Sequence, residues 1–112
     1  MASELSFVQY VCDQLDHLPG IAYRKMFGEY AFYHDQKVVA LICDNQFYLK
    51  PTDAGKLILG TPEMGHPYPG SKPYFVVTDM IEDRDVFVSL ILATGEALPM
   101  PKPKKKKQSD RG

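Results

Sequence analysis

The sequence predicts a two-layer α+β domain, in which an antiparallel sheet of about five strands carries helices packed on one face. Three observations support this fold class. Apolar residues recur at helical spacing near both ends of residues 1–98. Between Ile21 and Leu49 the apolar period changes to two, and turn residues interrupt it at short intervals, as in antiparallel hairpins. The expected order is α-β-β-β-β-α-β-α, since helices on one side of such a sheet bury both apolar surfaces.

The first helix is expected near the N-terminus, where six apolar positions share one helical face. Ser3 or Ser6 is a candidate N-cap, because a hydroxyl there accepts a hydrogen bond from a free backbone N–H of the first turn. Pro19 and Gly20 end the helix. The apolar stripe comprises Leu5, Val8, Val11, Cys12, Leu15 and Leu18.

Four short strands are expected next, joined as a meander. Residues 38–43 are apolar on both faces, which is typical of a central strand. Phe47 and Leu49 alternate with polar neighbours, which indicates an edge strand or a one-sided strand. Gln36 disfavours a two-residue turn with positive φ at both positions, so we expect a longer turn there. The turn signals lie at residues 27–29, 34–36 and 44–45.

The second half of the chain predicts a short helix, a strand and a final helix. Thr52 or Asp53 caps the short helix, and Gly60 ends it. Residues 61–73 hold four prolines and two glycines, so we expect no regular structure there. Residues 72–79 read as a strand. Asp79 or Asp83 caps the last helix, whose apolar stripe comprises Val86, Phe87, Leu90, Ile91 and Thr94.

A change of composition predicts one domain over residues 1–98 and a disordered, Pro/Lys-rich basic tail over residues 99–112. A chain of 112 residues is long enough for one domain whose core needs no disulfides. The tail carries six bases against one acid, whereas the preceding residues carry seven bases against thirteen acids. The formal net charge of −1 therefore hides an acidic body joined to a basic tail.

The cysteine content and the N-terminus favour a cytoplasmic protein. Cys12 and Cys43 are too few for a disulfide framework and lack the spacing of a zinc site. The N-terminus carries acids where a signal peptide has a basic start, and the longest apolar run is far too short to cross a bilayer. We therefore expect a cytoplasmic location and no membrane segment.

One run of residues in the predicted sheet carries a family resemblance. Arg24, Met26, Phe27, Gly28 and Tyr30 lie in the string RKMFGEYAFYHDQKVVALICDNQFYLKP, and the strand PYFVV and a helix follow it. In this order the chain resembles the N-terminal domain of the bacterial TfoX (Sxy) competence regulators. It departs where the family tends to have glycine or proline, at Glu29, Ala31, Gln36 and Thr78.

The resemblance covers roughly residues 4–98 and implies a cytoplasmic, secretion-chaperone-like domain that acts by holding partners. It implies no chemistry and no cofactor. Larger members carry a second, helical domain, in whose place this sequence has the basic tail. Family members regulate the transcription of DNA-uptake genes. The resemblance therefore implies a non-enzymatic regulatory or adaptor role with an unidentified protein partner, for which a transcription regulator is one candidate. The five motif residues are the candidate interaction site. A monomer and a homodimer are both allowed.

The aromatic stretch has a second interpretation as a nucleic-acid platform. Arg24 and Lys25, followed by aromatic residues, are faintly similar to the RNP1 pattern, in which rings on a sheet stack bases. Glu29 and the acidic body oppose it, because they repel phosphates. We therefore expect the apolar side chains between Tyr23 and Leu49 to point mostly inward, and Arg24 to bond carbonyls or an acid across the sheet.

The tail lysines are a separate candidate site. An alternative function is weak, non-specific nucleic-acid binding, for which five neutralised phosphates give a log affinity that falls with log salt at a slope of about −4. The other interpretation is a solvated tail that aids solubility. These lysines are Lys102, Lys104, Lys105, Lys106 and Lys107.

The sequence contains no complete catalytic or metal-binding set, so we expect neither enzyme activity nor a metal site. Cys43 and Asp44 are adjacent in a strand, so their side chains point to opposite faces. A nucleophilic Cys43 would require a histidine from elsewhere in the fold. His66 is expected in an exposed loop. The loop over residues 61–73 is either a crossover or a mobile partner-binding lip.

Overall fold

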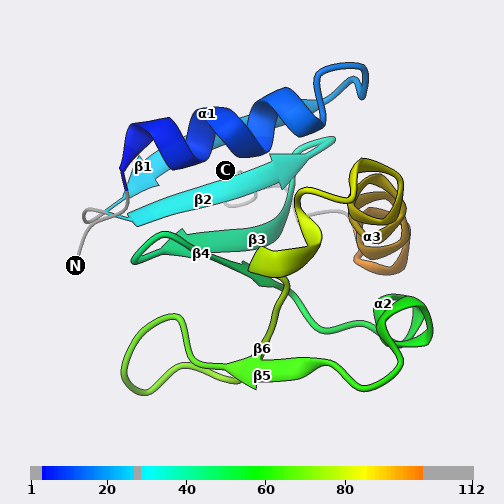
Figure 1. Cartoon of the computed structure of the whole chain (residues 1–112). Helices are drawn as coiled ribbons and strands as arrows, with labels where there is room; N and C mark the ends of the chain where they lie inside the picture. The colour runs from blue at the N-terminus through cyan, green and yellow to red at the C-terminus, as the bar shows by residue number, and fades with distance from the viewer. Residues whose placement is uncertain (1–3, 27–28, 100–112) are drawn as a thin grey trace, which may run out of the picture.

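The computed structural model describes residues 4–26 and 29–99, which form a six-stranded antiparallel sheet with three α-helices (Figure 1). The strand order is β1-β2-β3-β4-β6-β5. The predicted α+β class and the order of its elements are confirmed. The elements are α1 (Leu5–Gln14), β1 (Ile21–Met26), β2 (Glu29–His34), β3 (Lys37–Cys43), β4 (Gln46–Leu49), α2 (Asp53–Leu59), β5 (Glu63–Gly65), β6 (Tyr74–Val76), the 3-10 helix η1 (Thr78–Met80) and α3 (Arg84–Ala97).

The strand β5 lies in the segment predicted to be irregular, and that prediction was wrong. Met64 lies opposite Phe75 of β6, and the strand forms one edge of the sheet. Pro62 and Pro67 fall outside the three paired residues. Proline, which has no backbone N–H, therefore does not occupy a position that donates a hydrogen bond between these strands. Because β4 pairs with β3 on one side and with β6 on the other, it is an inner strand and not an edge.

Strand register gives the sheet two chemically different faces. Phe32 lies opposite Ala40, Ala40 opposite Leu49, and Leu49 opposite Phe75, so these four side chains form a row on one face. All four are buried. We call this side the helix face. The adjacent row, which comprises Ala31, Leu41, Tyr48 and Val76, lies on the opposite side, called here the open face.

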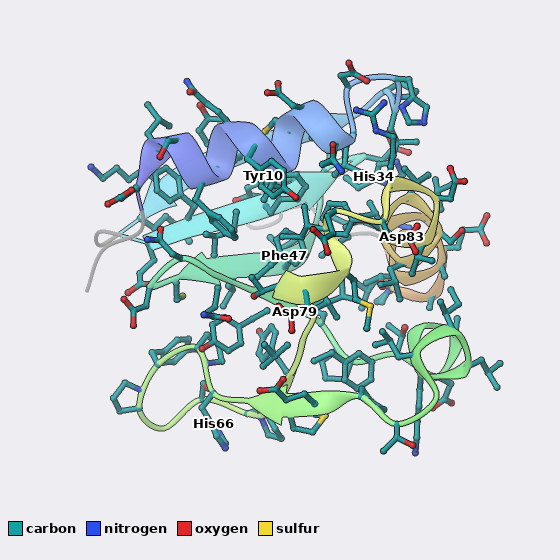
Figure 2. The ribbon with its side chains drawn as sticks, in the orientation of Figure 1. Tyr10, His34, Phe47, His66, Asp79 and Asp83 are labelled. Carbon is teal, nitrogen blue, oxygen red and sulfur yellow. The ribbon has the colours of Figure 1, made fainter. Side chains whose placement is uncertain are left out.

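The core is built on the helix face around the ring of Phe47. This ring makes edge contacts with Phe32 of β2 and with Phe87 of α3, at centroid distances of 5.6 and 5.1 Å. Figure 2 shows Phe47 near the centre of the molecule, beside η1. The helix α1 adds Val8 and Val11, both fully buried, to the same cluster. The prediction of a one-sided strand at β4 is therefore confirmed.

The β2–β3 hairpin holds the C-terminal end of α3. The Lys37 Nζ donates a hydrogen bond to the Gly95 carbonyl oxygen at 2.6 Å, where the helix dipole is negative. The His34 ring packs against Gly95 so closely that a Cβ there would lie 2.8 Å from the His34 Nδ1. Gly95 is therefore required for α3 to approach the sheet.

Both inner hairpins use two-residue loops in the left-handed region. Asp35 and Gln36 have φ values of 51° and 71°, and Asp44 and Asn45 have 52° and 58°. Positive φ at both central residues matches the twist of paired strands. The prediction of a longer turn at Gln36 was therefore wrong, because the strand pairing outweighs the backbone preference of glutamine.

The helix caps differ in part from those expected. Thr52 caps α2, and its Oγ1 accepts a hydrogen bond from the Gly55 N–H at 3.0 Å. Ser6 lies inside α1, whose N-cap is Glu4, and Ser3 is outside the described residues. Asp83 is the N-cap residue of α3, but its side chain makes no capping hydrogen bond. The α1 and α3 starts thus depend on packing rather than on hydroxyl or carboxylate caps.

We predict that Gln36→Gly stabilises the protein. Glycine removes a left-handed backbone penalty of about 1–2 kcal/mol per residue, from which its greater freedom in the unfolded chain subtracts about 0.5–1 kcal/mol. The net gain of about 0.5–1 kcal/mol is measurable by urea unfolding. The matched control is Gln36→Ala, which keeps the penalty and should give no gain. A Gln36→Gly protein no more stable than Gln36→Ala would contradict the assignment of this turn.

Candidate interaction site at the edge of the sheet

The strand β1 forms the long edge of the sheet. All six of its residues pair with β2, and no described strand pairs with its other side. The last five residues are exposed to solvent. The opposite edge, β5, has three residues. An exposed edge of this length presents unpaired backbone N–H and C=O groups to a partner chain.

Side chains on β1 alternate between the two faces. Tyr23 lies opposite Phe32 on the helix face, where its ring contacts Tyr30 edge to face at 5.7 Å. Arg24 and Met26 lie on the open face, opposite Ala31 and Glu29. Tyr23 and Met26 are about 40% exposed, which is high for apolar side chains in a small domain.

Two hollows flank this edge. One of about 330 Å³ lies between α1 and β1 and is mainly apolar, with Leu15, Leu18 and Tyr23 in its lining. The other, of about 910 Å³, follows β1 from Gly20 to Arg24 and reaches the β2–β3 turn. An added strand would therefore find an apolar recess on one side and a basic side chain on the other.

The residues of the motif that carries the family resemblance differ in burial. Tyr30 is a core residue with 6% exposure, whereas Arg24 and Met26 are exposed on β1. Phe27 and Gly28 lie outside the described residues, as do the five tail lysines. Within the described residues Arg24 has no hydrogen bond or ion pair, so the predicted bond across the sheet was wrong.

The nucleic-acid platform is not supported by the described residues. Phe32 is fully buried and Tyr30 nearly so, and a buried ring cannot stack a base. Arg24 and Lys25 point to opposite faces of β1. The prediction that apolar side chains point mostly inward holds for the helix-face residues of β2, β3 and β4. It does not hold for Leu41 and Tyr48 on the open face, or for the exposed Tyr23 and Met26 on the edge.

Cys43 has the surroundings of a structural thiol. Burial, a hydrogen bond to Glu29 and the Glu29 charge together raise the pKa of Cys43 to about 12. His34 lies on the helix face and Cys43 on the open face, so they cannot form a dyad. His66 lines the same hollow as Cys43, yet its Nδ1 is 2.9 Å from the Ser71 carbonyl oxygen, and Figure 2 shows it at the outside of the molecule. This arrangement keeps the thiol protonated and inert.

The part of the chain that the structure describes gives no support for a metal site or a membrane-spanning helix. Across residues 4–26 and 29–99, no three His, Cys, Asp or Glu side chains are grouped so as to hold a metal ion. No helix among the same residues is long and apolar enough to cross a membrane.

Comparison with known proteins identifies the family. Residues 13–98 match the model of the TfoX N-terminal domain. The chain belongs to this family. The match begins within α1 and ends one residue after α3, so the whole TfoX N-terminal domain sheet and its β1 edge lie inside it.

A curated relative is similar in length to this TfoX N-terminal domain protein. It comes from Spirochaeta aurantia and is named "Uncharacterized 12.7 kDa protein in trpE 5'region". The two are 46% identical over 112 residues, which are 100% of this chain and 97% of the relative. Neither the family description nor this name refers to a catalytic activity.

We predict that Cys43 reacts slowly with iodoacetamide in the folded protein at pH 8. A pKa raised from the ordinary value of 9.0 to about 12 lowers the thiolate fraction at pH 8 roughly a thousandfold. The measurement uses a Cys12→Ser background, with the urea-unfolded protein as reference. Glu29→Gln should speed the reaction, because the carboxylate that disfavours the thiolate is removed. A folded rate within tenfold of the unfolded rate would contradict the assignment of Cys43 as a protected thiol.

Proposed function

We propose that this protein is a non-enzymatic regulatory or adaptor module that binds a partner protein by strand addition at β1. The observation that carries the proposal is the exposure of this six-residue edge strand on five of its six residues. Backbone hydrogen bonds to an added strand supply affinity, and recesses for alternate side chains supply specificity.

The chemistry of the edge defines the kind of partner segment. The recess between α1 and β1 accepts an apolar side chain against Leu15, Leu18 and Tyr23. On the open face the free guanidinium of Arg24 can donate hydrogen bonds to an acidic side chain. A hydrogen bond between arginine and a carboxylate is stronger than one between uncharged groups. The partner segment therefore alternates apolar and acidic residues over about six positions.

Membership of the TfoX N-terminal domain family supports a regulatory process. Through the resemblance to competence regulators, we assign the partner to the transcription machinery of the bacterial cytoplasm. The two cysteines are both free in the structure, which fits a reducing compartment.

We predict that a photocrosslinking amino acid at Ala22 captures a discrete partner in the native host. Ala22 is exposed on β1, and a strand added to this edge would lie beside it. Leu57, which is 85% exposed on α2, is the matched control position and should give no adduct. Arg24→Glu should reduce the Ala22 adduct, because it places like charges together.

The mass of the adduct separates the possible partners. An adduct with a different protein supports the adaptor function. An adduct at twice the chain mass of 12.7 kDa would mean that the edge serves a homodimer, and the adaptor function would be contradicted. Equal adducts at Ala22 and Leu57, or none at Ala22, would contradict strand addition itself.

A further inference from the structure

The open face of the sheet carries a groove that no described segment fills. Three adjoining hollows of about 550, 440 and 450 Å³ share Tyr68 in their linings. The loop between β5 and β6 places this residue over the open face, where its side chain is 52% exposed. We call the three hollows together the Tyr68 groove.

One end of the Tyr68 groove is acidic. Glu29, Cys43 and Asp44 line it beside Tyr48. Burial raises the pKa of Tyr48, with further contributions from Cys43 and from the charges of Asp44, Glu29 and Glu63. The Glu29 Oε1 is buried, and among the described residues it has no hydrogen-bond partner. A buried carboxylate oxygen of this kind calls for a donor, and a cationic donor suits the charge.

The other end of the groove is the point at which the described chain ends. Leu98, directly after α3, lines it together with Tyr74, Lys50 and Lys72. The sequence that follows is Pro-Met-Pro-Lys-Pro-Lys-Lys-Lys-Lys, over residues 99–107. The chain thus leaves α3 at the wall of the groove.

The segment is long enough to span the groove. Lys50 follows β4 and Asp44 precedes it, so the two ends of the groove lie roughly 15 Å apart along the strand. With roughly 10 Å across the strands from β6 to β3, the separation is about 18 Å. A proline-rich segment in an extended conformation rises about 3.1 Å per residue, so about six residues cover that distance, which is the number from Leu98 to Lys104.

We propose that residues 99–107 bind in the Tyr68 groove of their own chain. Their prolines pack on Tyr74 and Tyr68, since aromatic-lined grooves are the usual receptors of proline-rich segments. Their lysines pair with Glu29 and Asp44. Because the segment is tethered at the groove mouth, weak contacts suffice for occupancy. Docking withholds the lysines from polyanions, so the tail is autoinhibited rather than free.

The test is paramagnetic relaxation enhancement on the full chain carrying a spin label at Ser109→Cys. The background is Cys12→Ser, and Cys43 stays unlabelled because its thiol is buried and protonated. We expect strong broadening of the amide signals of Tyr48 and Tyr68, and none at Leu57 on α2. Glu29→Gln should lower the groove broadening roughly threefold, as loss of one charge pair predicts. Glu82→Gln, an exposed acid outside the groove, should leave it unchanged.

Three outcomes would overturn the proposal. Broadening that is weak and uniform, or insensitive to Glu29→Gln, would show that the tail does not occupy the groove. Broadening that also appears when ¹⁵N-labelled protein is mixed with spin-labelled ¹⁴N protein would place the tail in a second copy. Absence of broadening, together with perturbation of the tail signals by a short DNA duplex at low salt, would assign the lysines to nucleic acid.

Discussion

The contact on which the rest of the structure depends is the Phe47 ring, held edge to face between Phe32 of β2 and Phe87 of α3. The backbone of Phe47 is also held, by two hydrogen bonds. The Phe47 N–H donates to the Thr78 Oγ1 at 3.0 Å, and its carbonyl oxygen accepts from the Val77 N–H at 3.1 Å. One residue of β4 therefore holds β2, α3 and the Val77–Thr78 segment together on the helix face of the sheet.

Local patterns predicted the elements whose stability is decided along one strand or helix. The apolar spacing of α3 and the strict alternation in β4 indicated which side chains enter the core, and the structure places them there. The strand β5 escaped prediction because its pairing with β6 is non-local. Gly65 permits it, since a Cβ there would lie 2.8 Å from the Val76 Cγ2 and 3.2 Å from the Tyr48 ring. No sequence period records that fit.

The candidate sites depend on the spatial order of the strands, which the sequence pattern does not contain. The motif around Arg24 was recognisable as a string, but its division into a buried Tyr30 and an exposed Arg24 follows from the position of β1 at the edge. The Tyr68 groove likewise arises because a loop folds over the open face. The two surfaces adjoin, since Met26 ends β1 and also lines the groove. A segment in the groove would therefore lie beside any strand added to the edge.

The claim that the sheet is stabilised from one side is tested most directly by truncating two neighbours in β4, Phe47 and Tyr48, which point to opposite faces. Urea unfolding of Phe47→Ala should show a loss of about 3–5 kcal/mol, the usual cost of emptying a buried phenylalanine site. Tyr48→Ala should cost less than half as much, because its ring is only partly buried on the open face. Equal losses for the two variants would contradict the account, because they would show that the open face is as much a part of the core as the helix face.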